Sequence, residues 1–432
     1  MEILYENSNN KLLLNTLELN NGVVPPKTNH KESEIMEFTN LTNLLHHIVD
    51  DLHVPFVQCQ VYKEGKEVYN HGYGDAQKDT PVTPQHTYNL YSTTKFITCT
   101  AALQLLEQGK YIMTDPLYEY FPQFKDMLVK VKDINAELAA KVVQGQKVEY
   151  KTDNDILLVE AKRPILIKDV FNMTAGFNYD RNAQSFKDIK EETEGRFPTL
   201  RIADALANNP LSYQPGEKWG YSLGHDLLGA FVELVSGMKF GEYLKKNIFE
   251  PLGMDSFTFE RNEKIYSKMA EQYQYDYETK TAHNVGKGNP HILGTEFESG
   301  GAGLAGSAED YGKFVTAMSL GGISPKGERI LSEHTVDLMR TNCLNDEQLK
   351  FFNWSQLIGY GYGYGVRTHM DRAKSGGLSP VGEFGWGGAA GAYAMVDKDN
   401  QIAVFYGQHM LNNLEPYIHP RIRNAVYSSL DK

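Results

Sequence analysis

The sequence predicts an α+β protein in which helices flank an antiparallel sheet and a mostly helical lobe is inserted into the chain. Strand patterns occur between residues 54 and 74 and again from residue 360, whereas residues 115–298 have mostly helical patterns. The 432 residues also exceed one typical domain. We therefore expect an N-terminal arm at residues 1–35. An α/β lobe would combine residues 36–114 and 299–432, and a mostly helical lobe would comprise residues 115–298. The cleft between the two lobes is the expected site.

The first elements follow from local patterns. Residues 1–35 are polar, rich in asparagine and broken by Pro25-Pro26, which indicates a loosely attached arm. Phe38 to Leu52 has the apolar spacing of a helix. Val54 to Val68 and Tyr69 to Gly74 have strand patterns, and we expect a hairpin around Lys63-Glu64-Gly65.

A helix is predicted directly after Ser92. Apolar side chains recur from Phe96 to Leu106, and Gly109 stops the pattern. Further along, Val148 to Tyr150 and Ile156 to Val159 predict a small hairpin around Asp153-Asn154-Asp155. Proline and glycine mark the turns of the helical region at Pro122, Pro164, Gly176, Pro215-Gly216 and Pro251-Leu252-Gly253.

Strand patterns return in the last quarter of the chain, at Tyr360 to Val366, Ala390 to Val396 and Gln401 to Tyr406. The run from Tyr360 to Gly365 alternates tyrosine and glycine, so we expect a strand with its tyrosines on one face. No helix start follows that run, which argues against a phosphate-binding loop.

Composition excludes several classes of protein. The net charge of −12 argues against nucleic acids and anionic membranes as partners, because both bind through lysine and arginine. The three cysteines are few and far apart, which fits a reducing compartment without disulfides or zinc. No secretory signal or membrane span is visible, so we expect a cytoplasmic protein. Its oligomeric state cannot be predicted from the sequence.

The most informative motif is Ser-x-x-Lys, which occurs four times, at Ser8 to Lys11, Ser92 to Lys95, Ser236 to Lys239 and Ser429 to Lys432. Only Ser92 opens a helix. Residues three apart share one helix face, so an unprotonated Lys95 amine would reach the Ser92 hydroxyl and take its proton. The free N–H groups at the helix start would help to hold the negative oxygen that forms when a carbonyl is attacked.

Two further segments complete the predicted site. Tyr221 lies between a turn and an apolar helix, and its phenol is a candidate second proton carrier. Residues 384–391 carry small side chains that would let a strand edge approach the substrate. A backbone N–H from this edge, together with that of Ser92, would form an oxyanion hole.

These segments resemble the serine beta-lactamase-like superfamily, in the branch of class C beta-lactamases, D-Ala-D-Ala carboxypeptidases and family VIII esterases. The resemblance covers about residues 40–428, and its motifs are Tyr91-Ser92-Thr93-Thr94-Lys95, Asp115-Pro116, Arg163 to Asp169, Thr174-Ala175-Gly176, Pro215-Gly216-Glu217, Tyr221-Ser222, Pro251 to Met254 and Gly300 to Leu304. It implies a beta-lactamase/transpeptidase-like fold and a small-molecule ester or amide as substrate, without a cofactor. It also implies that Ser92 is the acylated nucleophile, Lys95 and Tyr221 the proton carriers, and Ser92 with Ala389 the oxyanion donors.

The chain departs from the penicillin-recognising pattern at two positions. Leu223 stands where those proteins usually have an asparagine, and Trp386 stands where they usually have a lysine or histidine. Each lost polar contact weakens recognition by about 1–3 kcal/mol, so a carboxylate-bearing beta-lactam or peptide should bind poorly. The version Trp386-Gly387-Gly388 resembles the esterase branch, and we expect these residues and Leu223 to contact an apolar ester. A penicillin-binding protein, carboxypeptidase or beta-lactamase is the alternative.

Other assignments remain open. Gly220 to Gly224 matches the G-x-S-x-G elbow of α/β-hydrolases, with Ser222 as nucleophile, but no buried strand precedes it. A cap at the start of the following helix is the simpler role for Ser222. The cluster His46, His47, Asp50, Asp51 and His53 could bind a metal, although a solvated helix end explains it more simply. The alternative outside the enzymes is a binding protein that keeps this fold without catalysing a reaction.

Overall fold

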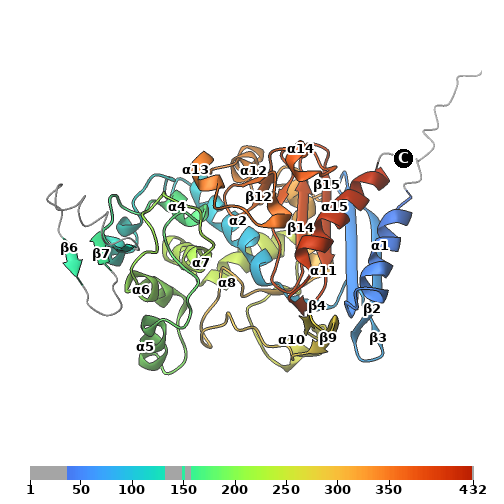
Figure 1. The fold of residues 1–432 in the computed structure, drawn as a ribbon, viewed down its shortest axis with the longest axis horizontal. Helices are drawn as coiled ribbons and strands as arrows, with labels where there is room; N and C mark the ends of the chain where they lie inside the picture. Colours follow the sequence, from blue (N-terminus) through green and yellow to red (C-terminus); the bar gives the residue numbers. More distant parts are fainter. Residues whose placement is uncertain (1–36, 132–147, 151–156, 431–432) are drawn as a thin grey trace, which may run out of the picture. The chain divides into compact units, whose positions relative to one another are not determined.

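A central antiparallel sheet joins the two ends of the chain, as the sequence predicts (Figure 1). The computed structural model describes residues 37–131, 148–150 and 157–430, so the predicted arm at residues 1–35 lies outside it. In the described part, eight strands follow the order β11-β12-β13-β14-β15-β1-β2-β3. Their bounds are β1 Phe56–Lys63, β2 Lys66–Gln77, β3 Thr80–Pro81, β11 Tyr360–Tyr362, β12 Arg367–His369, β13 Phe384–Gly385, β14 Tyr393–Asp397 and β15 Ile402–Gly407.

Strand β1 pairs with strands from both ends of the chain. Val61 lies opposite Val404 of β15 on one side and Tyr69 of β2 on the other. Because both neighbours are antiparallel, the first hairpin and the last strands form one continuous sheet.

Two predicted strand boundaries are wrong. The first hairpin turns at Glu64 and Gly65, which have positive φ angles of 51° and 77°, so the second strand begins at Lys66 and not at Tyr69. The predicted strand from Tyr360 ends at Tyr362. Gly365 has a φ of +86° and lies so close to Cys99 that an added Cβ would be 2.3 Å from its sulfur. The chain therefore turns here and does not continue as a strand with aligned tyrosines.

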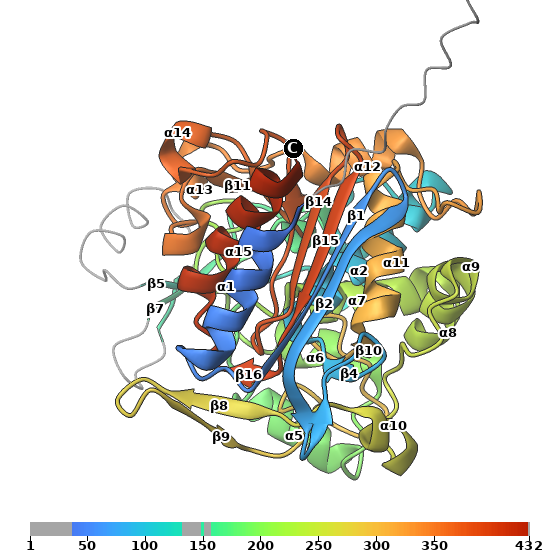
Figure 2. The same ribbon diagram turned by 90° about the vertical axis from the view of Figure 1, so that its right-hand side faces the viewer.

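Helices cover both faces of the sheet (Figure 2). Helices α1 (Thr39–Asp50) and α15 (Glu415–Leu430) pack side by side on one face, where Leu45 and Ile422 belong to the same buried cluster. Helix α11 (Ala308–Ser319) lies on the other face, against β1, β14 and β15. The predicted helix 38–52 thus agrees with α1.

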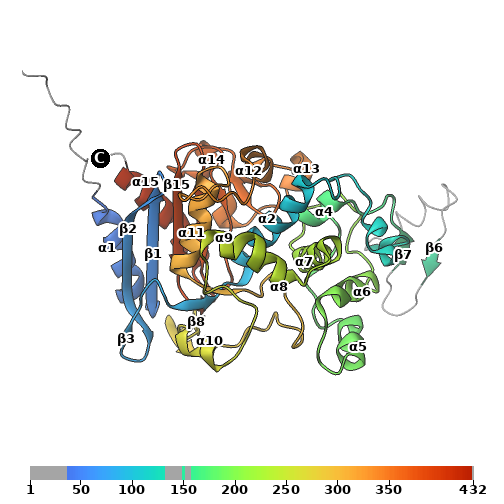
Figure 3. The same cartoon turned by 180° about the vertical axis from the view of Figure 1, so that it is seen from behind.

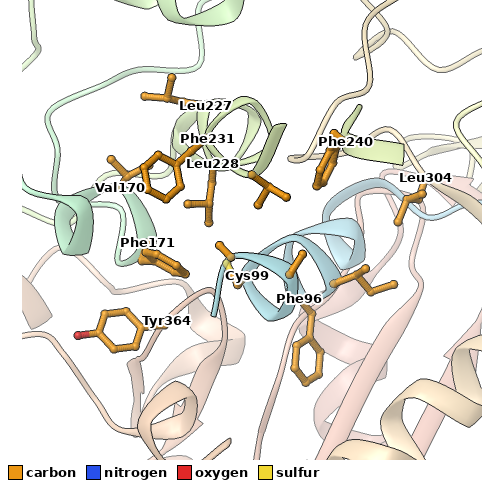
Figure 4. Packing of buried hydrophobic residues seen from close by; sticks show 14 of the residues in the cluster. Phe96, Cys99, Val170, Phe171, Leu227, Leu228, Phe231, Phe240, Leu304 and Tyr364 are labelled. Atoms are coloured by element: carbon orange, nitrogen blue, oxygen red, sulfur yellow. The ribbon is translucent and has the colours of Figure 1, made fainter. Parts of the chain in front are cut away.

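Helix α2 (Thr94–Glu107) connects the sheet region to the helical region (Figure 3). All side chains from Thr94 to Leu105 are buried, as expected for a helix with neighbours on every side. Figure 4 shows Cys99 of α2 facing Phe171 of α4 (Ile167–Phe171) and Leu228 of α7 (Gly224–Ser236). This packing fixes the start of α2 relative to the start of α7.

The remaining elements lie mostly between residues 115 and 298, where the prediction of a mainly helical region is confirmed. The helices are α5 Gln184–Glu192, α6 Ile202–Ala207, α8 Phe240–Leu244, α9 Glu250–Leu252, α10 Glu263–Lys268, and later α12 Glu333–Arg340, α13 Asp346–Leu349 and α14 Arg372–Ser375. The strands are β4 Thr87–Asn89, β5 Leu128–Val131, β6 Val148–Tyr150, β7 Leu157–Glu160, β8 Tyr273–Asp276, β9 Thr281–Asn284, β10 Ala305–Ser307 and β16 Met410–Leu411.

Strands β6 and β7 pair antiparallel, so the predicted small hairpin is confirmed, while its turn at Asp153-Asn154-Asp155 lies outside the described residues. The division into two lobes stays a prediction. Among the residues that the structure describes, no helix combines the length and the apolar character needed to cross a lipid bilayer.

Candidate active site

The site is built around the start of α2. Ser92 lies in a 3₁₀ turn, Tyr91–Thr93, and Lys95 is in the first turn of the helix. The Lys95 ammonium donates hydrogen bonds to Ser92 Oγ at 3.2 Å and to the Gly301 carbonyl at 2.6 Å. Lys95 is 0% exposed, whereas Ser92 is half-buried. The predicted contact between the amine and the hydroxyl is confirmed, and it leaves the hydroxyl partly open to solvent.

The backbone just before Ser92 is strained. Tyr91 has a φ of +46°, a conformation that costs about 1–3 kcal/mol for a residue other than glycine. The surrounding structure holds it, because the Tyr91 hydroxyl donates to Gln272 Oε1 at 2.9 Å and the Leu90 amide donates to the Leu304 carbonyl at 3.0 Å. Such strain persists where several contacts fix one geometry, here that of the Ser92 turn.

Two tyrosines lie beside Lys95. Its ammonium nitrogen is 4.7 Å from the ring centroid of Tyr221 and 5.7 Å from that of Tyr179. The two phenol rings stack with centroids 5.5 Å apart and planes only 5° from parallel. Tyr221 was expected here from the sequence, and Tyr179 was not. Tyr179 follows Thr174-Ala175-Gly176 closely, and this proximity to a family motif is the signal that could have identified it.

The surroundings of Lys95 act on its pKa in opposite directions. Burial lowers the pKa of Lys95, but negative charge on Tyr179, Tyr221 and Asp226 raises it, and the net effect is a raised pKa. Burial also raises the pKa of the Tyr179 phenol, against the opposing effect of Lys95. The raised pKa favours the ammonium form of Lys95, whereas the sequence-based hypothesis used the unprotonated amine as the base.

Asp226 of α7 supplies a buried carboxylate close to this ammonium. Its Oδ1 accepts hydrogen bonds from the Ser299 hydroxyl and from the Gly301 amide, the latter at 3.2 Å. A Cβ at Gly301 would be 2.4 Å from Asp226 Oδ2, so only glycine fits there. Burial raises the pKa of Asp226, and the positive charge of Lys95 opposes this effect. Asp226 thus positions Gly301 by accepting from its amide, and the Gly301 carbonyl in turn accepts a hydrogen bond from Lys95.

The loop that carries Ala389 lies against the Ser92 turn. A Cβ at Gly388 would be 2.5 Å from the Leu90 carbonyl oxygen, so the two segments touch backbone to backbone. The Asn413 side-chain amide donates to the Gly388 and Ala389 carbonyls, both at 3.0 Å. In the described structure, the amide N–H groups of Ser92 and Ala389 donate to no other protein group. Both amides are therefore available to an incoming oxyanion, as their predicted role requires.

The three tryptophans of the chain surround Tyr221. Ring centroids lie 6.1 Å away for Trp219, 5.3 Å for Trp354 and 5.8 Å for Trp386, and Trp386 Nε1 donates to the Tyr221 hydroxyl at 3.3 Å. Trp219 and Trp386 are buried, whereas Trp354 is 36% exposed. The wall of the site next to Tyr221 is thus aromatic, and of the three rings Trp354 is the most accessible from solvent.

The other predicted site residues differ in their accessibility. Gly387 is half-buried and Ala389 is exposed, so both can meet a ligand. Leu223 is only 2% exposed and packs in the main hydrophobic core, and its predicted contact with substrate stays a prediction.

The rival nucleophile Ser222 and two buried histidines, His225 and His409, make contacts outside the Ser92 site. Ser222 is buried, donates to the Met173 sulfur at 3.3 Å and accepts from the Gly224 amide at 3.3 Å, at the start of α7. His225 bonds to the Phe171 carbonyl, and His409 contacts the Asn89 amide and the Ala270 carbonyl. Among the described residues, no three His, Cys, Asp or Glu side chains come together as a metal-binding group.

The half-buried Ser92 hydroxyl, the buried Lys95, the Tyr221 phenol and the two available amides are the kinds of group that acyl transfer through a serine uses. The family model described as "Beta-lactamase" matches residues 41–423, so the chain belongs to the beta-lactamase family, a family of serine hydrolases. The fold class expected from the sequence is confirmed by the solved structures that match this chain.

Individual relatives have diverse activities. The chain is 29% identical to protein Rv1367c of Mycobacterium tuberculosis over 78% of this chain and 80% of that protein. It is 27% identical to the lovastatin esterase of Penicillium rubens over 61% of this chain and 63% of that protein. The structure of EstCE1, a hydrolase with promiscuous acyltransferase activity, superposes with a TM-score of 0.70 at 21% identity, over 90% of this chain and 97% of that one.

Proposed function

We propose that the protein is a carboxylesterase of the beta-lactamase-like type, which hydrolyses esters through an acyl-enzyme at Ser92. The observation that carries the proposal is the 3.2 Å hydrogen bond between Lys95 and the half-buried Ser92 hydroxyl, with the amides of Ser92 and Ala389 donating to no other described protein group. The similarity to a lovastatin esterase and to EstCE1 supports an ester as the substrate.

In the acylation step, the Ser92 oxygen attacks the ester carbonyl carbon and its proton passes to the pair formed by Lys95 and Tyr221. The Lys95 nitrogen is 4.7 Å from the centre of the Tyr221 ring, and the pair accepts the proton in the form that holds one proton fewer than an ammonium and a phenol together. The negative oxygen of the tetrahedral intermediate accepts hydrogen bonds from the amides of Ser92 and Ala389. The intermediate collapses when the alcohol leaves with the proton from Tyr221.

Deacylation repeats these steps with water. Tyr221 takes a proton from the attacking water, and the Ser92 oxygen leaves the second tetrahedral intermediate and is reprotonated by Tyr221. The same two amides hold the oxyanion in both steps. Each group therefore returns to its starting protonation state after one turnover.

The walls of the site favour an apolar ester. Trp386 occupies the position at which a penicillin-recognising enzyme usually has a cation, and Trp354 exposes an indole beside it. An indole stacks on apolar acyl or alcohol groups and gives no charge to pair with a carboxylate at this position. We therefore infer a preference for esters over penicillins.

A panel of p-nitrophenyl esters of increasing acyl length, with nitrocefin as the beta-lactam, tests the proposal. We expect hydrolysis of the esters and a loss of kcat of at least about a thousandfold in Ser92→Ala. An active-site-directed phosphonate should label Ser92 in the wild type, as found by mass spectrometry of peptides. Ser222→Ala is the matched control and should be labelled like the wild type.

Three outcomes would contradict the proposal. Labelling of Ser222, or equal labelling of Ser92→Ala, would show that the nucleophile is a different residue. Faster turnover or stable acylation by nitrocefin would favour a beta-lactamase or penicillin-binding protein. No turnover of any ester, without labelling, would favour a non-catalytic binding protein.

A further inference from the structure

A groove with a cationic rim adjoins the site on the side of Tyr179. It has a volume of about 360 Å³, and it is lined by apolar side chains together with three cations. The cations are Arg181, Lys187 and Lys190, and the main apolar residues are Phe186, Phe197 and Ile292. We call it the cationic groove. Lys187 and Lys190 are three residues apart on α5, so both side chains project from one face of that helix. Phe186 and Phe197 are buried and form an apolar floor with stacked rings 6.1 Å apart.

The cationic groove is connected to the candidate active site through His291. Arg181 follows Tyr179 by two residues, and its guanidinium donates to the Pro290 carbonyl. The next residue, His291, packs edge-on against both Tyr179 and Tyr91, with ring centroids 5.7 Å and 5.8 Å apart. Burial lowers the pKa of His291, and the positive charge of Arg181 lowers it further. His291, which stands between two lining residues of the groove, thus contacts both Tyr179 and the residue before Ser92.

The three cations have no acidic partners in the described structure. Arg181, Lys187 and Lys190 take part in no salt bridge there, and the described residues that line the groove include no aspartate or glutamate. The acids of α5 form no salt bridge with the two lysines: Glu192 pairs with Arg201 at 2.8 Å, and Asp188 accepts from Gln184 at 2.6 Å. The side chains that line the groove therefore carry only positive charge, in a chain with a net charge of −12.

We propose that the cationic groove binds an anionic group carried by the substrate, so that the preferred substrate is an ester whose acyl chain ends in a carboxylate or phosphate. The apolar floor takes the methylene chain, and the cations at the rim pair with the terminal anion. This proposal rests on the proposed esterase function, because it assigns the far end of the same substrate.

The groove and the missing penicillin anchor lie at different ends of the site. The Tyr221 ring stacks on Trp386 at 5.8 Å and on Tyr179 at 5.5 Å, and the cationic groove adjoins Tyr179. An anion placed next to the reacting carbonyl, at the Trp386 end, meets an indole. An anion at the end of a chain of several methylenes reaches the cations instead.

The test compares two esters of equal length, p-nitrophenyl octanoate and the mono-p-nitrophenyl ester of suberic acid, which differs by its terminal carboxylate. The measured quantity is the ratio of kcat/KM for the suberate ester to that for the octanoate ester. We expect the double variant Lys187→Gln/Lys190→Gln, and separately Arg181→Gln, to lower this ratio by about fivefold each. Lys326→Gln, on an exposed turn outside the groove, is the matched control and should keep the wild-type ratio. The corresponding ω-phosphonate ester distinguishes a phosphate from a carboxylate as the preferred anion.

A ratio that stays within about twofold of the wild type in both groove variants would overturn the proposal while leaving the esterase function intact. If neither ester is hydrolysed, the esterase proposal fails, and calorimetric titration of Ser92→Ala with suberate then decides about the groove. Binding that disappears in the Lys187→Gln/Lys190→Gln background supports an anion site, and absence of binding refutes it.

Discussion

Gly388→Ala tests whether the close contact between the Ala389 loop and the Ser92 turn positions the oxyanion donors. The new Cβ would lie 2.5 Å from the Leu90 carbonyl oxygen, whereas ordinary contacts begin near 3.4 Å. The loop must therefore move by about 0.9 Å, the difference between these two distances. A displacement of about 1 Å of a catalytic group lowers the rate about a hundredfold, and removal of one oxyanion donor costs about 10²–10³ in kcat.

We expect kcat for a p-nitrophenyl ester to fall about 10- to 100-fold in Gly388→Ala, with a smaller change in KM, because the interaction forms in the transition state. The assay is steady-state hydrolysis together with thermal unfolding, which reports the separate cost of overpacking, about 1–3 kcal/mol. Gly288→Ala is the matched control, since no atom lies within 4 Å of its new Cβ. A Gly388→Ala enzyme with wild-type kcat, or equal losses in both variants, would refute the reasoning.

The remaining predictions concern buried charges. Asp226→Asn removes one of the negative charges that raise the pKa of Lys95. In a plot of kcat against pH, the change in rate that depends on the ionisation of Lys95 should therefore move to lower pH. A pH profile without this movement would contradict the role of Asp226. Burial lowers the pKa of His225 from 6.5 to about 3, so between these values the unfolded chain binds a proton that the folded protein excludes. The free energy of unfolding should fall with decreasing pH in this window, by up to about 1.4 kcal/mol per pH unit, and His225→Gln should flatten the slope in urea titrations. An unchanged slope in that variant would assign the acid sensitivity to other groups.

The parts of the site that could be predicted are those set by local spacing. Ser92 and Lys95 are three residues apart at a helix start, and helix geometry alone brings the two side chains together. The small residues of the Gly388 loop likewise predict a close backbone approach, which the Leu90 carbonyl provides. Local patterns also predict the sheet from both chain ends, because strands such as β15 are recognised by their own apolar residues.

The parts that could not be predicted depend on contacts between distant segments. Tyr179 and Asp226 come near Lys95 only through the packing of α7 and the segment after α4 against α2. The pKa of Lys95 depends on effects from all of these segments, so the spacing of the motif could not show the direction in which this pKa is shifted. The strand after Tyr360 was predicted too long for the same reason, since the chain turns where Gly365 meets Cys99 of α2.

The gathering of all three tryptophans around Tyr221 makes the intrinsic fluorescence of the protein a local signal. In most proteins the emission averages indoles from many environments, but here the centroid of every indole lies 5.3–6.1 Å from that of the same phenol. A ligand that covers the exposed ring of Trp354 removes water from it and should shift the emission to shorter wavelength. Occupancy of the site can therefore be followed in the unlabelled protein, in the Ser92→Ala variant and without turnover.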